Sequence, residues 1–498
     1  MSLDPTRIPV LVGIGQSIER DGVTDAVDLA SRAAMAAFED APGLVDKIQR
    51  LSMVAVSFSP IGLAPATEVS ERLKLTDVRC EASTPGGNSP QWLMNRACHE
   101  IARGELETTI ILGAEATRSM RIADPDADFL RAATQDRSQE AGPRDEVVGA
   151  SIRGMLGPAE IEANLLRPAD TYPIFESALA AKLGSTPEES RQRIAAFMSR
   201  SSEVAAKNPF AWFQQARSVE EIAQATPANR ITAEPYTKCM NSFANVDQGS
   251  ALLVTSLAIA KQAGLADQSV FAWSGATNTE LVPAARRELG GSPAIRAAAK
   301  ATFSAAGVSL DDIDFIDLYS CFPVAVEVGA AEIGLALDDA RGLTQTGGMS
   351  FFGGPGNNYT SHGIAAVALR LRESNGSARF GYVSGNGGVL SKHSLGIYGS
   401  EPPSGGFVLA DTSAAQAEID ASALEVVHEA NAEASVDGST VVYDRTGNPA
   451  AAPIIASLAD GRRVVAVASE EILPTLAGRT LVGETVRVTG ANPPVYTL

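Results

Sequence analysis

Three glycine-rich loops are the parts of this sequence best suited to chemistry. The first loop is Pro85-Gly86-Gly87-Asn88, the second is residues 353–358 (GGPGNN), and the third is residues 384–388 (SGNGG). Backbone N–H groups at the start of a helix bind anions or stabilise an oxyanion. Tight packing of a strand against a helix is the alternative for any one loop, but three loops in matched places favour a ligand site. The candidate oxyanion groups are the backbones of Gly87, Asn88, Gly354, Gly387 and Gly388.

Cys321 and Tyr319 are the first candidates for proton transfer. They follow the apolar run 313–318 (IDFIDL), and the ends of strands are where sites of α/β proteins gather. A cysteine with a pKa of about 8.5 can move protons near neutrality if its surroundings lower that value. A buried, inert thiol is the alternative. The hydroxyl of Tyr319 can protonate a carbanion or an enolate.

Two of the four histidines lie near the loops in sequence. His362 stands about two turns into the helix after the second loop, and His393 follows the third loop. Histidine is the natural proton carrier near pH 7, so both are candidate site residues. His99, on an expected surface helix, and His428, near the C-terminus, are not.

The elements around the first two loops occur twice in the same order. In each copy a helix leads to a buried strand, then to a glycine-rich loop, a second helix and a second strand. Two such copies predict two pseudo-equivalent halves, each an α/β layer. The first copy is Asp25–Asp40, Leu51–Phe58, the first loop, the helix that ends at Gly104 and Thr109–Leu112; the second is Ala294–Ala306, Ile313–Leu318, the second loop, its helix and Arg379–Val383.

Composition excludes several classes of protein. The 498 residues carry a net charge of −19, without the basic footprint of a nucleic-acid binder. No apolar stretch reaches the ~18 residues of a membrane helix, and the start lacks a signal-peptide pattern. The scattered cysteines, Cys80, Cys98, Cys239 and Cys321, predict neither a metal site nor disulfides. We therefore expect a reduced, cytoplasmic protein that binds no nucleic acid, membrane or metal.

The chain divides into four parts by composition. Residues 1–117 form the first half, and 118–235 are a polar insertion rich in Asp, Arg and Pro. Residues 236–400 form the second half, with a returning strand and helix of the first half at about 245–265. A Pro/Ser/Gly-rich linker follows. The pattern of residues 401–498 is typical of short strands with turns and predicts a small β-rich domain.

This layout resembles the thiolase superfamily, and within it the sterol-carrier-protein-2-type thiolases. It is most similar to the thiolase-like proteins of type 1, which are acetyl-CoA acetyltransferase-like and carry an additional C-terminal domain. The resemblance covers about residues 5–400 for the core and the rest for the extra domain. It implies a fold of two pseudo-duplicated βαβαβαββ halves in five αβαβα layers, with the insertion as the loop domain.

The motifs that carry the resemblance have lost most of their reactive side chains. The family's nucleophilic cysteine matches Gly87, and the histidine of its Gly-His-Pro motif matches Gly354. The late cysteine of the Cys-x-Gly loop matches Ser384. The family's His-Asp-Cys-Phe motif is only partly kept. Its cysteine, the expected acid/base group, is Cys321, and its phenylalanine follows at the next position. Tyr319 replaces the histidine.

The resemblance implies an acyltransferase of lipid metabolism that acts on acyl-CoA or β-keto substrates. Because Gly87 cannot be acylated, CoA thiolate or water would attack the carbonyl directly, in a retro-Claisen reaction; a retro-aldol reaction or a decarboxylation is also open. Coenzyme A is the expected co-substrate, with no covalently bound cofactor, and Lys238 is a candidate contact for its phosphates. A non-catalytic acyl-CoA-binding or scaffold protein is the alternative. A homodimer and a partner protein held by the C-terminal domain both stay open.

Overall fold

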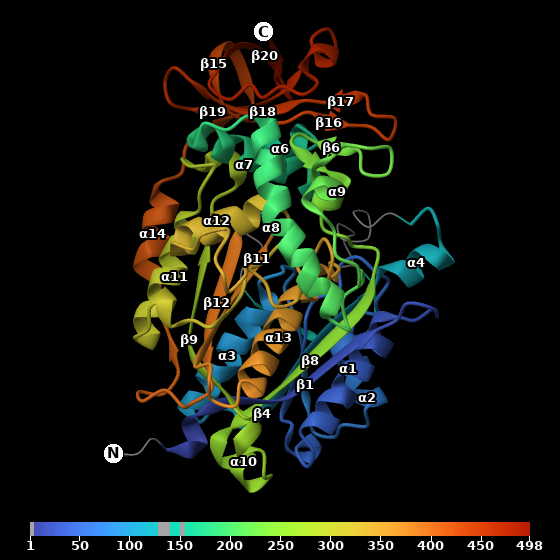
Figure 1. Cartoon of the computed structure of the whole chain (residues 1–498), viewed down its shortest axis with the longest axis vertical. Helices are drawn as coiled ribbons and strands as arrows, with labels where there is room; N and C mark the ends of the chain where they lie inside the picture. The colour runs from blue at the N-terminus through green and yellow to red at the C-terminus, as the bar shows by residue number, and fades with distance from the viewer. Residues whose placement is uncertain (1–3, 128–139, 150–154) are drawn as a thin grey trace.

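The computed structural model describes residues 4–127, 140–149 and 155–498. Figure 1 shows the two halves below the C-terminal domain, which forms one end of the molecule. Within these ranges, no helix combines the length and the apolar character needed to cross a bilayer.

The elements of the two halves follow the predicted order. The predicted helix over 25–40 is α1, and the helices after the first and second loops are α3 and α13. The first half consists of β1 (Pro9–Ile18), α1 (Ala26–Asp40), β2 (Arg50–Met53), α2 (Pro65–Arg72), β3 (Arg79–Ser83), α3 (Ser89–Arg103), β4 (Thr108–Ala116), α4 (Thr117–Ala123), β8 (Asp247–Ser256) and α10 (Leu257–Gln262). The second half consists of β9 (Val270–Thr279), α11 (Pro293–Ala306), β10 (Phe315–Asp317), α12 (Pro323–Ile333), α13 (Tyr359–Glu373), β11 (Phe380–Gly387) and β12 (Lys392–Gly399).

The strands of both halves join in one eleven-stranded sheet. The order is β10-β11-β12-β9-β1-β8-β4-β2-β3-β5, with β13 (Val408–Leu409) beside β9. The halves meet where β1, antiparallel to β8 along its length, also pairs with β9 through Val10 and Leu11. The outer side of β3 is covered by β5 (Glu146–Val148), a strand of the insertion.

Helices divide the sheet into the layers of a thiolase fold. α3 and α13 contact each other and strands of both halves, so they form the middle layer (Figure 1). α1 and α2 cover the outer face of the first half, and α11 packs on β9 and β12 of the second. The predicted α/β architecture of two similar halves is confirmed.

Small residues let α1 lie directly on β1. A Cβ on Gly13 would stand 2.6 Å from the carbonyl oxygen of Ala37, and one on Gly15 only 1.9 Å from that of Ala33. The helix is alanine-rich on this face and begins at Asp25, whose carboxylate accepts the N–H of Asp28. The close approach of helix and strand therefore depends on glycine in the strand and alanine in the helix.

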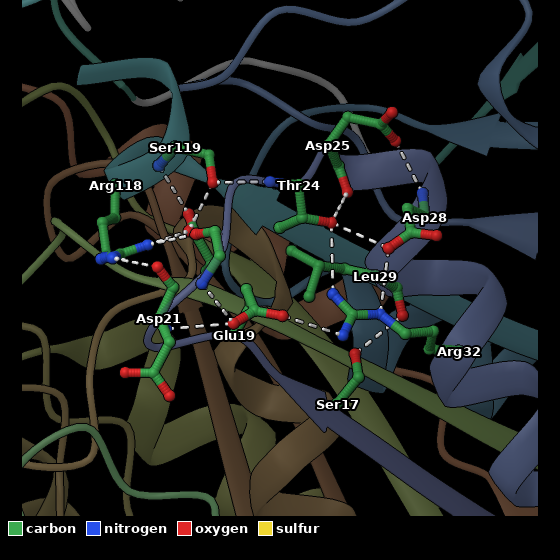
Figure 2. A network of polar contacts seen from close by, with 12 residues as sticks. Ser17, Glu19, Asp21, Thr24, Asp25, Asp28, Leu29, Arg32, Arg118 and Ser119 are labelled. Atoms are coloured by element: carbon green, nitrogen blue, oxygen red, sulfur yellow. Dashed lines mark hydrogen bonds and ion pairs between the residues drawn. The ribbon is translucent and has the colours of Figure 1, made fainter. Parts of the chain in front are cut away.

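Ion pairs fix the loop between β1 and α1. Arg32 contacts Glu19 at 3.4 Å, and the hydroxyl of Ser119 donates to the fully buried carboxylate of Asp247 at 2.7 Å. The amide of Thr24 in turn donates to Ser119 at 2.9 Å. Figure 2 shows Glu19, Thr24, Arg32 and Ser119 grouped around the loop. The end of β1 is thus tied to α4 and β8 by polar contacts.

The insertion is mostly helical and packs over the second half. Of its long helices, α7 contacts α12 and β15 of the C-terminal domain, and α8 contacts α12 (Figure 1). Pro173 lies inside α7, and Thr186 caps α8 in a capping box with Glu189. The elements after β5 are α6 (Pro158–Glu162), α7 (Pro168–Leu183), α8 (Pro187–Lys207), α9 (Val219–Ala223), β6 (Ile231–Ala233) and β7 (Tyr236–Thr237).

The C-terminal domain is β-rich, as predicted, and includes a small barrel. Its sheet runs β14-β19-β18-β15-β20-β21, and the pairing of β19 with β21 closes five of these strands on themselves. The sequence did not predict helix α14 (Ser413–Ala421), which comes before the barrel strands and lies against α11. The strands are β14 (Val426–Val427), β15 (Glu429–Ser439), β16 (Val442–Tyr443), β17 (Pro449–Ala451), β18 (Pro453–Leu458), β19 (Arg463–Ala468), β20 (Thr485–Ala491) and β21 (Val495–Thr497).

Candidate functional site

The three glycine-rich loops come together at the start of α3. The side-chain carbonyl of Asn357, in the second loop, accepts the N–H of Gly86 at 2.9 Å. The hydroxyl of Thr360 donates to the carbonyl of Gly87. A Cβ at Gly385, in the third loop, would stand 2.9 Å from the Cα of Asn88. These contacts leave no room for larger residues where the loops meet.

Tyr319 fills the space above Gly87. A Cβ on Gly87 would stand 2.0 Å from the Tyr319 hydroxyl oxygen, 2.5 Å from its Cζ and 2.6 Å from the carbonyl oxygen of Asn386. Cβ atoms do not approach other atoms this closely. The place that a nucleophilic side chain would take at this position is therefore occupied by a phenol.

A second hydroxyl fills the space at Gly354. A Cβ there would stand 2.2 Å from the Oγ of Ser242. The N–H of Gly354 donates to the carbonyl of Phe243 at 2.8 Å, so it is already satisfied within the chain. By contrast, no residue in the described ranges accepts the N–H of Gly87 or of Asn88. Of these three N–H groups, the two at the N-terminus of α3 are therefore free donors.

Cys321 lies beside Tyr319 in a ring of polar groups. Its thiol is 3.8 Å from the Nδ2 of Asn386 and also contacts the Tyr172 hydroxyl. Burial raises the pKa of the Cys321 thiol to about 12, and its hydrogen bonds offset only part of this rise. Burial also raises the pKa of Tyr319. The surroundings therefore raise the pKa of Cys321 instead of lowering it, and both groups keep their protons at neutral pH.

Tyr172 of α7 organises the third loop, and the sequence analysis missed it. Its hydroxyl accepts from the N–H of Leu390 at 2.9 Å and from Asn386 Nδ2 at 3.0 Å, and it lies 3.1 Å from the carbonyl of Gly388. The ring stacks on Phe322 at 4.5 Å between centroids. Tyr172 lies far from the loops in sequence and in no motif, so no sequence signal marked it.

A small cavity joins several of the predicted residues. It is lined by Tyr319, Ser384, Asn386 and His393 among others, and its volume is about 10 Å³. A separate cavity of about 20 Å³ lies beyond Phe322, against α8. Each holds about one water molecule. Within the described residues, neither cavity is large enough for a thioester.

The remaining predicted residues lie in different surroundings. Ser384 accepts the N–H of Tyr319 at 3.0 Å and so positions the backbone. His393 lines the small cavity, while His362 does not: its Nδ1 lies 2.7 Å from Gln16 of β1. Burial lowers the pKa of each histidine to about 3, so both are neutral at physiological pH. Lys238 is exposed at the end of β7.

Lys392 is a second residue that the sequence analysis missed. It is fully buried at the start of β12, and its ammonium group donates to the carbonyl of Pro85 beneath the first loop. Burial lowers its pKa to about 8. Because side chains alternate along a strand, Lys392 and its neighbour His393 face opposite sides of the sheet. The site therefore has a cation behind the first loop.

Several polar atoms near the loops have no hydrogen-bond partner among the described residues. They are Asn88 Oδ1, Asn386 Oδ1 and His393 Nε2, all in buried side chains. Buried polar atoms usually have a hydrogen-bond partner, and an unsatisfied group costs about 1–3 kcal/mol. Among the residues described, no three His, Cys, Asp or Glu side chains gather as a metal site would need. The arrangement therefore offers neutral hydrogen-bond donors around a small cavity, with the ammonium group of Lys392 behind the first loop.

Comparison with known proteins supports the predicted resemblance and the fold. The sequence profile described as "Thiolase-like protein type 1 additional C-terminal domain" matches residues 415–492. A search of curated proteins found no match. The crystal structure of a monomeric SCP2-thiolase like protein type 1 from Mycobacterium smegmatis is 32% identical, covers 100% of both chains and superposes with a TM-score of 0.84.

More distant structures share the fold. The Ltp2-ChsH2(DUF35) aldolase is 20% identical over 79% of this chain and 98% of its own, with a TM-score of 0.60. Human mitochondrial 3-ketoacyl-CoA thiolase in complex with CoA is 16% identical over 80% of this chain and 100% of its own, with a TM-score of 0.55. At these identities the likeness concerns the fold alone. The match over the full length at 32% identity, together with the profile, shows that the chain belongs to the SCP2-thiolase-like proteins of type 1.

Proposed function

We propose that the chain makes or breaks a carbon–carbon bond next to the carbonyl of an acyl-CoA or β-keto substrate, without an acyl-enzyme. The observation that carries this proposal is the hydroxyl of Tyr319 above Gly87. A phenol at the place of the nucleophile cannot be acylated in the family's manner, but it can donate a proton to the carbon or oxygen that receives charge.

The raised pKa values suit the role of a donor. Tyr319 and Cys321 stay protonated at neutral pH, and each can hydrogen-bond to a carbonyl or enolate oxygen. When the Cα–Cβ bond of the substrate breaks, its electron pair passes to the thioester enolate. Tyr319 then gives its proton to Cα and regains one from the β-hydroxyl of the substrate (retro-aldol) or from the thiol of CoA (retro-Claisen), while the free N–H groups of Gly87 and Asn88 stabilise the oxyanion.

Coenzyme A is the proposed co-substrate. A thiolase of the same fold is known in complex with CoA. In a retro-Claisen reaction the CoA thiolate would attack the β-keto carbonyl, whereas a retro-aldol reaction would need only a β-hydroxy thioester. We keep Lys238 as the proposed contact for the CoA phosphates because it is exposed and its side chain forms no ion pair with any described residue.

The test compares Tyr319→Phe with Tyr398→Phe. Tyr398 is the matched control because it is equally buried and its hydroxyl bonds to Gln91 at 2.9 Å, away from the cavity. We expect 3-ketoacyl-CoA with CoA, or 3-hydroxyacyl-CoA alone, to be cleaved by the wild type. Tyr319→Phe should lower kcat by about 100-fold or more, and Tyr398→Phe should change it little. Equal activity of Tyr319→Phe and the wild type contradicts the proposal.

A non-catalytic acyl-CoA-binding protein is the second candidate. The observation that favours it is the lack of a reactive side chain at Gly87 and Gly354, where the hydroxyls of Tyr319 and Ser242 fill the space instead. Saturable binding of acyl-CoA with no turnover of either substrate class would support this candidate and refute the catalytic one.

A further inference from the structure

Lys392 is a buried amine that the function proposed above does not use. Its side chain is fully buried at the start of β12, and its ammonium group donates to the carbonyl of Pro85. Burial is the cause of its lowered pKa, and no charged side chain of the described ranges contributes to the shift. A buried charge without a counter-charge is costly, and ionisable groups held in this way gather at functional sites. The described residues therefore give this amine no partner that explains its charge.

Two glycines make room for the amine. A Cβ on Gly86 would stand 2.8 Å from Lys392 Nζ, and one on Gly387 would stand 3.1 Å from its Cε. Gly86 also has a φ of 149°, which residues with a side chain rarely adopt. The first and third loops thus both carry glycine where they meet the end of the Lys392 side chain.

The side chain of Asn88 shares this space. A Cβ on Gly86 would stand only 2.6 Å from Asn88 Oδ1. The Nδ2 of Asn88 donates to the hydroxyl of Ser394 at 3.2 Å, whereas its Oδ1 has no hydrogen-bond partner among the described residues. An ammonium group has three donors, and the carbonyl of Pro85 takes one of those on Lys392. The amine therefore has an acceptor on each side of Gly86 in sequence, Pro85 before it and Asn88 after it.

The amine lies behind the free N–H groups of the first loop and outside the small cavity. The residues that line this cavity include His393 but not Lys392. The ammonium group lies against Gly86, and the two N–H groups without an acceptor, those of Gly87 and Asn88, come directly after it. A positive charge at this place lowers the energy of an anion that these N–H groups bind, and the effect is strong away from water.

We propose that Lys392 is a positioning residue of this site: it holds the first loop through Pro85 and Asn88, and its charge favours a ligand that binds as an enolate or another oxyanion. The inference rests on the function proposed above and deepens it, because it specifies that the species held most tightly at the N–H groups of Gly87 and Asn88 is an anion. Lys392 touches no substrate atom, and no covalent step passes through it. Its charge acts through space.

Acetoacetyl-CoA without free CoA is the probe, because its enolate has an ultraviolet absorption band that its keto form lacks. Titration of the full chain gives both Kd and the enolate fraction of the bound ligand. We expect this fraction to exceed that of the free ligand at the same pH by about tenfold or more in the wild type, and Lys392→Met to lose the increase. Lys261→Met is the control and should keep it, because Lys261 is exposed on α10. A change in Kd with the same enolate fraction in Lys392→Met would show a purely structural role and overturn the proposal.

The pH dependence of the wild type gives a second test that needs no variant. The pKa of Lys392 is about 8 in the free protein, and an anion bound nearby raises it. The ratio of bound to free enolate fractions should therefore be constant below pH 8 and decline towards pH ~10 as the ammonium loses its proton. Around the cavity, burial raises the pKa values of Tyr319 and Cys321 and keeps His393 neutral, so these groups do not account for such a decline. A ratio that stays constant over this range would contradict the role of the charge.

Turnover after addition of CoA separates this inference from the function on which it rests. We expect kcat to be lower in Lys392→Met by about tenfold or more, with KM changed by less than about threefold. Enolate enrichment without any cleavage would refute the catalytic function and support the role of Lys392. Cleavage with the same kcat in Lys392→Met and the wild type would overturn that role and leave the function standing. Absence of acetoacetyl-CoA binding would overturn both.

Discussion

The contact between Gly87 and Tyr319 makes a sharp prediction about packing. In Gly87→Ala, the new methyl would stand 2.0 Å from the Tyr319 hydroxyl oxygen and 2.6 Å from the carbonyl oxygen of Asn386. The backbone at Gly87 is not in the left-handed region, so strain in φ plays no part. Overpacking of this kind costs about 1–3 kcal/mol. Restriction of the unfolded chain returns about 0.4–1 kcal/mol, so we expect a net loss of about 1–2 kcal/mol.

Changes at Tyr319 separate the sources of this loss. In a Tyr319→Phe background the ring carbon Cζ remains 2.5 Å from the methyl, so Gly87→Ala should still destabilise the protein. In a Tyr319→Ala background the ring is gone and only the contact with Asn386 persists. There the cost of Gly87→Ala should fall by about 1 kcal/mol or more, because residues in contact do not act additively.

Urea unfolding measures the free energy of unfolding of each variant. Amide hydrogen exchange in α3 distinguishes unfolding of the core from unfolding of the C-terminal domain. Gly405→Ala is the control, because a Cβ there meets nothing within 4 Å. We expect this control to be neutral or slightly stabilising. Two results would refute the packing at this position. One is a Gly87→Ala variant as stable as the wild type. The other is a loss of stability on Gly87→Ala that is the same in the wild-type, Tyr319→Phe and Tyr319→Ala backgrounds.

Three further predictions follow from the same region. Gly87→Cys should not create thiolysis of acetoacetyl-CoA, because position 354 also lacks the histidine; strong cleavage by this variant contradicts us. Tyr172→Phe should lower the free energy of unfolding by about 2–3 kcal/mol, because Leu390 N–H and its neighbours lose their acceptor, and an unchanged urea midpoint argues against this. Lys392 has a pKa of about 8 in the folded state, below its ordinary 10.5, so the unfolded chain binds the proton more tightly. Wild-type stability should therefore rise relative to Lys392→Met by about 3 kcal/mol between pH 8 and 10.5, and parallel pH profiles would contradict the burial of this amine.

The parts of the fold that could be predicted are those encoded by local sequence patterns, because such patterns involve residues close together in the sequence. Alanine at helical spacing after Asp25 marked α1, and the glycine-rich loops marked the starts of α3 and α13. The helix α14 escaped notice because its short polar sequence has only one buried residue, Ile419. The closure of the barrel depends on the pairing of β19 with β21, which no local pattern reveals.

The site could be predicted only in part. The sequence showed that Gly87 lacks a reactive side chain, but not that Tyr319 fills the space, because that contact joins residues more than 200 positions apart. The pKa of Cys321 depends on burial in three dimensions, and the orientation of His362 depends on which face of α13 meets β1. Tyr172 reaches the third loop from the insertion, where neither spacing nor motif pointed to it.

The measurement that tests the central claim most directly is calorimetric titration with CoA and acetyl-CoA, followed by the intact mass of the acetyl-CoA sample. Gly87 has no side chain to acylate, and Cys321 is buried and protonated. We therefore predict binding of both ligands with no change in protein mass. An increase by one acetyl group would contradict a mechanism without an acyl-enzyme, and absence of binding would contradict a CoA-dependent function for this fold.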